Sequence, residues 1–382
     1  MVQRILQEKA VNLAKKFPFV VITGPRQSGK TTLTKMAFPD YRRVSLEDMD
    51  NRAFAQEDPR GFIATYSDRT IIDEVQRVPH LLSYLQTHCD DEGKEGMYIL
   101  TGSQNMELME SVDQSLSGRV GLLHLLPFSK TEMKESGFWN QNIDNMLLQG
   151  SYPRLYDKGI APCDYYPSYI NTYIERDVRR IKNITELSKF ERFLKMCAAR
   201  IGQLLNMSSL ANDCGISVPT VEQWISVLEA SYILFRLKPD FKNYSKRLVK
   251  TPKLYFYDTG LACSLLDIKT ETQMNTHYLR GNLFENLVVS DFIKDEFNNG
   301  AIETALSFWR DSRGNEVDII KRIGEEEFAY EIKSAATFNE SFTKGLDYWA
   351  KLSNADSAHK TVLYGGTGEM LRSNAMIQPF MK

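Results

Sequence analysis

The chain has 382 residues, a net charge of −2 and a pI near 6.3. It is therefore too long for one ordinary core, and it has no overall positive charge that would indicate a nucleic-acid-coating protein. Its 42% hydrophobic and 25% charged residues are typical of a soluble globular protein, and no apolar run reaches the roughly 18 residues of a membrane span. The five cysteines are scattered without a CxxC pair, which argues against a disulfide framework or a cysteine zinc site. We predict a cytoplasmic protein of two or three domains without a membrane segment.

Residues 1–160 are predicted to form an α/β domain. Short apolar runs rich in β-branched residues alternate with helix-length segments; the runs are FPFVVIT, RRVSL, RTIIDEV, GMYILTGS and GLLHLLPF. Strands that alternate with helices in this way predict a parallel sheet covered by helices.

The strongest motif is GPRQSGKT, residues 24–31, between the apolar run FVVIT and a helical stretch. This spacing and context are typical of a P-loop, in which backbone N–H groups curl around phosphates. Lys30 is expected to reach the β- and γ-phosphates, and the Thr31 hydroxyl is expected to bind Mg²⁺. The alternative is a glycine-rich turn without a ligand. The predicted nucleotide-binding residues are Gly24, Pro25, Arg26, Gln27, Ser28, Gly29, Lys30, Thr31 and Thr32.

A second strand, RTIIDEVQ, ends in two carboxylates. Asp73 is expected to hold Mg²⁺ through water, and Glu74 is expected to act as the general base for the attacking water. Alone, such a pair is more often a solvated turn, but a P-loop upstream favours the functional interpretation.

Two further residues are candidates at the same site. Ser103 follows the strand MYILTG and is the first choice to orient the attacking water; the alternative is a plain strand-ending turn. Arg119 precedes another apolar run and is a candidate to stabilise transition-state charge, either in its own subunit or in a neighbouring one. A surface arginine is an equally good interpretation of that position.

Residues 161–276 are predicted to be mainly helical and to contain a winged helix. SSLANDCGISVPTVEQWISVLEASYIL fits a helix-turn-helix with Val221 and Trp224 on the inward face of the second helix. A basic, tyrosine-containing stretch follows at 238–257 and predicts a DNA-contacting wing, although many winged helices serve only in packing or protein interaction. The predicted DNA-binding residues are Lys242, Lys246, Arg247 and Lys250, and Lys253 belongs to the same stretch.

Residues 277–382 carry acids within apolar segments. Glu285 lies on a helix, Asp318 in the strand EVDII, and Glu331 with Lys333 on one face of the strand AYEIK. This set matches the ligands of the restriction-endonuclease-like fold, in which carboxylates bind one or two Mg²⁺ and the lysine polarises water or phosphate. The alternative is a structural remnant in which Asp318 and Glu331 pair with Lys333, Arg313 or Lys321.

GPRQSGKTT, IIDEVQRVP, ILTGS and SLSGR, followed by GSYPRLY, YINTYIERDV, RGNLFEN, EVDII and YEIKS, resemble a family of predicted bacterial and archaeal ATPases. Members of that family have an AAA-type ATP-binding domain followed by a C-terminal region without an assigned function. The resemblance implies ATP in preference to GTP as the ligand.

The predicted fold class is an α/β, AAA-type P-loop NTPase domain (1–160), a helical and winged-helix region (161–276) and a small α/β restriction-endonuclease-like domain (277–382). The first predicted function is a Mg²⁺-dependent ATPase coupled to its C-terminal modules. The alternatives are an ATP-regulated DNA nuclease and an ATP-switched adaptor that binds DNA or a protein. A protein partner or a homo-oligomer is compatible with each.

Overall fold

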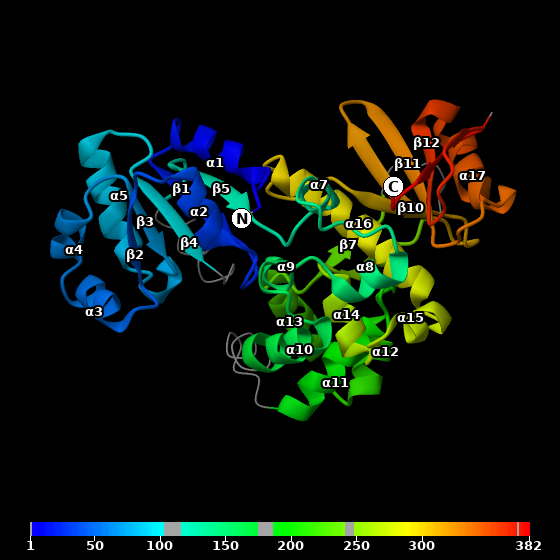
Figure 1. Ribbon diagram of the computed structural model, residues 1–382, viewed down its shortest axis with the longest axis horizontal. Coiled ribbons are helices and arrows are strands. Elements are labelled where there is room, and N and C mark those ends of the chain that lie inside the picture. Colours follow the sequence, from blue (N-terminus) through cyan, green and yellow to red (C-terminus); the bar gives the residue numbers. More distant parts are fainter. Residues whose placement is uncertain (1, 103–115, 175–185, 241–247, 373) are drawn as a thin grey trace.

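The computed structural model describes residues 2–102, 116–174, 186–240, 248–372 and 374–382. Figure 1 shows three parts: an N-terminal α/β part, a mainly helical middle and a C-terminal sheet flanked by helices. The predicted order of a parallel-sheet domain, a helical region and a C-terminal α/β domain is confirmed, with a mixed sheet in the last of these.

The N-terminal part contains a five-stranded sheet of order β2-β3-β4-β1-β5, and every neighbouring pair is parallel. Its strand β1 is buried on both faces: Phe19 and Val21 lie in one hydrophobic cluster, whereas Val20 and Ile22 lie in another. Such alternation within a wholly apolar run is expected when helices cover both sides of a parallel sheet. The elements are α1 (Leu6–Ala14), β1 (Phe19–Thr23), α2 (Lys30–Ala37), β2 (Arg42–Ser45), α3 (Met49–Glu57), α4 (Pro59–Thr65), β3 (Thr70–Asp73), the 3₁₀ helix η1 (Val75–Arg77), α5 (Leu81–Glu92), β4 (Tyr98–Gly102) and β5 (Val120–His124).

The middle part consists of helices around a three-stranded antiparallel sheet of order β6-β8-β7. The predicted helix-turn-helix lies in α12 and α13, with Val221 and Trp224 buried as expected, and Gly215 ends α12 at a φ of 63°. The elements are α7 (Lys130–Glu135), α8 (Ile143–Gln149), α9 (Pro153–Lys158), α10 (Pro162–Tyr169), the π-helix η2 (Ile170–Ile174), α11 (Leu187–Ala198), β6 (Gln203–Leu204), α12 (Met207–Cys214), α13 (Val218–Ala230), β7 (Leu234–Leu237), β8 (Lys253–Phe256), α14 (Thr259–Leu265) and α15 (Glu271–Thr276).

The C-terminal part is a six-stranded mixed sheet of order β13-β14-β12-β11-β10-β9. Its two faces belong to different cores: Ile332 packs in the core that includes α16, whereas Ala329 on the same strand packs in the core that includes α17. The elements are α16 (Arg280–Asn298), β9 (Ser307–Arg310), β10 (Glu316–Ile323), β11 (Glu326–Lys333), η4 (Glu340–Thr343), α17 (Lys344–Ser353), η5 (Ser357–His359), β12 (Lys360–Tyr364), β13 (Met370–Leu371) and β14 (Met376–Pro379).

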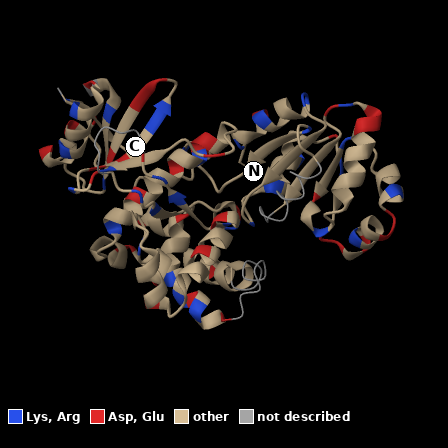
Figure 2. Ribbon diagram, turned by 180° about the vertical axis from the view of Figure 1, so that it is seen from behind, with Lys and Arg blue, Asp and Glu red and all other residues tan. Residues whose placement is uncertain are grey.

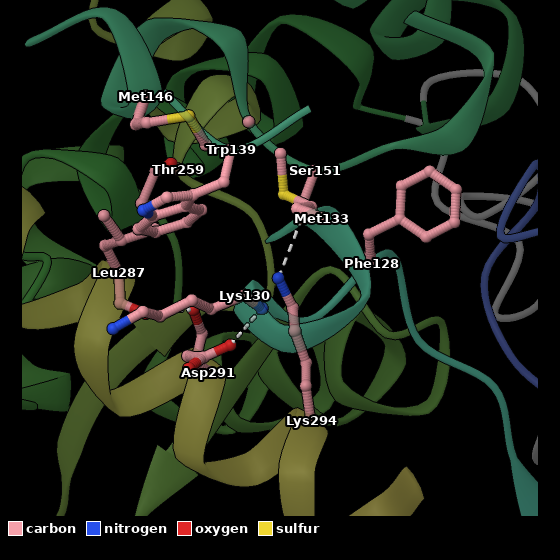
Figure 3. Close-up of a pocket in the computed structure, with 12 residues that line it drawn as sticks. Phe128, Lys130, Met133, Trp139, Met146, Ser151, Thr259, Leu287, Asp291 and Lys294 are labelled. Atoms are coloured by element: carbon pink, nitrogen blue, oxygen red, sulfur yellow. Dashed lines mark hydrogen bonds between the residues drawn. The ribbon is translucent and has the colours of Figure 1, made fainter. Parts of the chain in front are cut away.

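One hydrophobic core joins the middle part to helix α16, and it extends from Leu126 to Met381. At this junction Lys294 on α16 donates to the Ser151 hydroxyl at 2.8 Å, and Asp291 accepts from the Lys130 backbone N–H at 2.6 Å (Figure 3). The cavity between these side chains is about 10 Å³, which is room for a single water molecule. This junction is therefore a packed interface, and the predicted domain limits at 160/161 and 276/277 stay predictions.

Across the described ranges, none of the helices combines the length and apolarity needed to cross a bilayer.

Candidate functional site

The segment 24–31 forms a tight loop between the end of β1 and the start of α2. Gly24 has a φ of 150°, and a Cβ there would lie 2.1 Å from the Leu125 carbonyl oxygen. Gly29 has a φ of 98° and begins α2 in the left-handed region, where a side chain would be strained. Both motif glycines are thus required by the backbone path, and the N-terminal N–H groups of α2 lie at the end of the loop.

Lys30 lies inside this loop and is 6% exposed. Its ammonium donates to the carbonyl oxygens of Gly24 at 2.8 Å and Pro25 at 2.9 Å. Burial lowers the pKa of Lys30 to about 8, while the nearby carboxylates of Glu74 and Asp73 act in the opposite direction. A cation held only by neutral carbonyls in a buried place is well suited to receive an anionic ligand.

The two carboxylates at the end of β3 lie beside the loop. Asp73 accepts from the Thr31 hydroxyl at 3.3 Å and also from the hydroxyl of Thr101 on the adjacent strand β4. Glu74 takes a left-handed backbone conformation with a φ of 58°, and Gln76 donates to its carboxylate at 2.6 Å. Because the Thr31 hydroxyl and the Asp73 carboxylate are neighbouring hard oxygen donors, they fit Mg²⁺, which binds proteins through few carboxylates together with substrate phosphates.

A cavity of about 790 Å³ opens beside the loop, within the usual range for small-molecule sites. Its lining combines P-loop residues with the apolar side chains of Phe128, Phe138 and Pro153. Its lining includes the predicted residues Arg26, Gln27, Gly29, Lys30, Thr31, Thr32 and Glu74, together with Val2, Arg4, Glu47, Phe128, Phe138, Pro153, Arg154, Asp157 and Lys158, which the sequence did not predict.

Arg4 is a site residue for which the sequence gives no signal. It is 5% exposed, and its guanidinium donates to the carbonyl oxygen of Ser28 in the loop at 2.8 Å. The same side chain donates to Leu126 O at 2.7 Å and pairs with Glu132 at 2.8 Å. The chain before α1 therefore links the loop to α7.

A second contact links the end of β1 to the middle part. The Thr23 hydroxyl, His124 Nδ1 and the Tyr232 hydroxyl lie 2.7 Å from one another, directly before the loop. Burial lowers the pKa of His124 to about 4, so the ring is neutral near pH 7.

One of the predicted catalytic residues, Arg119, does not lie at this site. Arg119 lies before β5, at the edge of the parallel sheet opposite the loop, and its backbone O accepts from the first residue of β1. Its exposed guanidinium pairs with Asp90 at 2.6 Å. Parallel strands place Arg119 a strand length from the loop, so a role at the nucleotide site of its own subunit does not fit this position. A surface arginine and a role in a neighbouring subunit, which the sequence left open, stay predictions. Ser103 lies outside the described residues.

The C-terminal acids do converge, but on a lysine that the sequence assigned elsewhere. Lys253 is 2% exposed, and its ammonium pairs with Glu285 at 2.8 Å and also with Glu316 and Asp318. Lys333 pairs with Glu331 at 2.5 Å. Within the part of the chain that the structure describes, no group of three or more His, Cys, Asp or Glu residues is arranged to hold a metal ion.

The structure describes only part of the predicted DNA-binding stretch. Lys242, Lys246 and Arg247 lie outside the described residues, and Lys250 is exposed. Lys253, which was counted with them, is buried among carboxylates, so its assignment to a basic surface is corrected. In Figure 2 acidic and basic residues are interspersed along all three parts of the described chain.

Three families match consecutive segments of the chain. Residues 16–134 match an AAA domain, residues 140–272 a domain of unknown function (DUF8612) and residues 280–381 another domain of unknown function (DUF4143). The AAA match covers the parallel sheet that carries the P-loop.

Three curated relatives are described as uncharacterized proteins. Proteins from Mycobacterium tuberculosis and Mycobacterium bovis are each 26% identical over 324 residues, which is 84% of this chain and 71% of theirs. A protein from Methanocaldococcus jannaschii is 23% identical over 68% of this chain and 65% of its own.

Among solved structures, a Walker-type ATPase of Pyrococcus abyssi is 13% identical, with a TM-score of 0.46, over 68% of this chain and 94% of its own. AMPPCP-bound DnaA from Aquifex aeolicus is 16% identical, with a TM-score of 0.31, over 59% of this chain and 86% of its own.

Proposed function

We propose that this chain, an AAA-type P-loop protein with two C-terminal domains of unknown function, binds and hydrolyses Mg²⁺·ATP at the loop 24–31. The observation that carries the proposal is the placement of buried Lys30 between the P-loop carbonyls and the Asp73–Glu74 pair, at one end of a cavity of about 790 Å³. A nucleoside triphosphate fits this combination of a P-loop, a lysine, two strand-end carboxylates and apolar side chains in the cavity lining.

Each residue has a distinct role in this proposal. The Lys30 ammonium exchanges its carbonyl partners for phosphate oxygens and neutralises their charge. Thr31 and Asp73 would hold Mg²⁺, which would supply positive charge to neutralise the phosphates. Glu74 removes a proton from the attacking water, and the left-handed backbone at this position sets the direction of its side chain. Phe128 and Phe138, which line the cavity, supply apolar surface beside the base.

We further propose that nucleotide occupancy is coupled to the C-terminal modules. Arg4 bonds the P-loop to α7 through Glu132, and the Ser129 hydroxyl at the start of α7 accepts from Asn298 on α16 at 3.3 Å. Thr23, His124 and Tyr232 form the second connection. These contacts support a switch in which ATP binding at the P-loop acts on the C-terminal modules. A cytoplasmic location and a DNA or protein partner are further parts of the proposal.

Turnover of ATP by the purified chain with Mg²⁺ tests the central claim. Lys30→Met should lower the rate by about 100-fold or more, because one preorganised donor to developing charge contributes roughly that much. Lys35→Met is the matched control, since Lys35 lies on the same helix and is exposed. Equal turnover by the wild type and Lys30→Met would contradict the proposal.

A DNA nuclease in the C-terminal part is not favoured as a second function. The carboxylates expected to bind Mg²⁺ there pair with Lys253 and Lys333. The residues that would form the site therefore do not fit a divalent ion.

A further inference from the structure

The C-terminal carboxylates surround an ammonium group that comes from another part of the chain. Lys253 belongs to β8 of the middle sheet, whereas Glu285 lies on α16 and Glu316 and Asp318 lie on β10. The Lys253 nitrogen lies 2.8 Å from a Glu285 oxygen and 3.5 Å from an Asp318 oxygen. We call these three carboxylates, together with Glu331, the acidic socket.

Helix α16 fixes the strand that delivers this lysine. Asn286 accepts from the backbone N–H of Phe256 at 2.7 Å and donates to its carbonyl oxygen at 2.9 Å, so its amide pairs with the strand as a neighbouring strand would. Tyr255, two residues after Lys253 and thus on the same face of β8, donates to Glu285 at 2.5 Å. The consecutive residues Glu285 and Asn286 therefore bind the side chains and the backbone of one strand.

Other oxygens of the socket have partners, whereas Glu331 Oε2 is buried without a hydrogen bond among the described residues. Asp318 accepts from the backbone N–H of Ile332 at 2.8 Å, and Lys333 donates to Glu331 at 2.5 Å. Arg310 donates to Glu316 at 2.6 Å. The four carboxylates of the socket thus lie against three cations, Lys253, Lys333 and Arg310.

Electrostatics holds the ammonium in this place. Burial alone would lower the pKa of Lys253, but Glu285 and the other neighbouring carboxylates raise it well above its ordinary value, so the side chain stays charged. A tethered cation also has a high effective concentration at its site. A divalent ion would have to displace a group that is covalently attached beside the socket.

We propose that the acidic socket is a lock between the middle and C-terminal parts of the chain, in which the Lys253 ammonium takes the position that a divalent cation would take in a nuclease. The C-terminal sheet then serves to bind β8 and not to cleave DNA. This inference does not depend on the proposed ATPase function, since none of its residues lies at the P-loop.

The first experiment measures metal binding to the nucleotide-free wild type, which needs no variant to fold. Free Mn²⁺ is followed by electron paramagnetic resonance during titration of the wild type and Asp318→Asn. The lock predicts the same Mn²⁺ uptake by both proteins. Uptake of one Mn²⁺ per chain that is lost in Asp318→Asn would overturn the proposal.

The second experiment measures coupling between the two halves of the lock by urea unfolding. Lys253→Met and Glu285→Gln should each lower the folding equilibrium constant by about 100-fold or more, because each leaves a buried charge without its partner. The double variant should lose clearly less than the product of the two single losses. Lys250→Met, an exposed lysine three residues upstream, is the control and should change little. If the folding equilibrium constant of the double variant fell by the full product of the two single losses, the lock would be overturned.

Discussion

The nucleotide site and the acidic socket use the same types of residue and reach opposite outcomes. Each has a buried lysine and carboxylates at the strands of a sheet: Asp73 and Glu74 at the end of β3 in one case, and Glu316, Asp318 and Glu331 on β10 and β11 in the other. At the P-loop, the Lys30 ammonium bonds to backbone carbonyls beside a cavity of about 790 Å³. In the socket, the Lys253 ammonium bonds directly to the carboxylates and is 2% exposed.

The difference shows what separates a ligand site from a structural ion pair. Buried charges must be neutralised, either by one another or by a ligand. At the P-loop, the Lys30 ammonium bonds to neutral carbonyl oxygens beside a cavity, so an anionic ligand can take their place. In the socket, the fold joins the lysine directly to the carboxylates. The identities of the residues do not decide between these outcomes, but their partners do.

Glu74→Gln should give the largest effect and sharpens the assignment at the P-loop. The amide keeps the size of the side chain but cannot accept the proton of water, so ATP turnover should fall by about 10²- to 10⁴-fold. The affinity for ATP should change by only a few fold. Steady-state turnover and equilibrium binding of a nonhydrolysable ATP analogue separate the two quantities.

The control for this variant is Glu57→Gln, an exposed acid on α3. If Glu74→Gln lost binding and turnover in parallel, Glu74 would have a role in holding the ligand and not in proton transfer.

Asp318→Asn should have the next largest effect, and it should fall on stability alone. The change removes a charge beside Lys253 and weakens the bond from the Ile332 N–H, so the free energy of unfolding should fall by about 2 kcal/mol. Turnover of ATP at 25 °C should stay within about twofold of wild type. Urea unfolding and the ATPase assay measure the two effects.

Glu325→Gln provides the matched control, because Glu325 is an exposed acid on the turn between β10 and β11. If fully folded Asp318→Asn lost much of its ATP turnover, the socket would not be a purely structural site, and the contrast with the P-loop would fail.

The nucleotide site was the more predictable of the two because its main residues are contiguous in sequence. The P-loop and the Asp73–Glu74 pair each follow an apolar strand, and parallel strands bring their carboxyl ends to one edge. Arg4, Phe128 and Arg154 reach the same cavity from distant segments that carry no local pattern of their own.

The place of Lys253 was mispredicted because a basic, tyrosine-containing stretch has the composition of a nucleic-acid surface. The pairing of Glu331 with Lys333 agrees with the alternative that the sequence left open. A different signal was present: in KLYFY, residues 253–257, a single lysine precedes four strand-forming apolar and aromatic residues. All four residues of β8 are buried, and a lysine inside such a strand requires a carboxylate partner. Composition therefore identified Lys253 as a basic residue of the stretch, but it did not show that β8 directs this side chain into the core.

The pH dependence of ATP affinity tests whether the Lys30 ammonium contacts the nucleotide, and the effect should be moderate. The pKa of Lys30 is lowered to about 8, so its ammonium is present below pH 8 and is lost as the pH rises above that value. Affinity for a nonhydrolysable ATP analogue should therefore fall as pH rises, by up to about tenfold for each pH unit above the pKa.

Isothermal titration calorimetry between pH 7 and pH 9.5 measures this slope. Lys30→Met should bind weakly at every pH and lack the decline above pH 8. A wild-type affinity that stayed constant to pH 9.5 would show that Lys30 is not the titrating contact.

Arg119→Ala should have the smallest effect, and it asks whether the nucleotide site is complete within one chain. Arg119 lies at the opposite edge of the sheet, where its exposed guanidinium pairs with Asp90. An exposed pair of this kind contributes little, so thermal stability should hardly change. In dilute solution, ATP turnover should stay within about twofold of wild type, since the arginine cannot reach the phosphates of its own subunit.

The same assay over a range of protein concentrations extends the test to neighbouring chains. If wild-type turnover per chain rose with concentration and that of Arg119→Ala did not, the arginine would act across an interface between subunits. The nucleotide site would then depend on a second copy of the chain, whereas the acidic socket is filled by the chain itself.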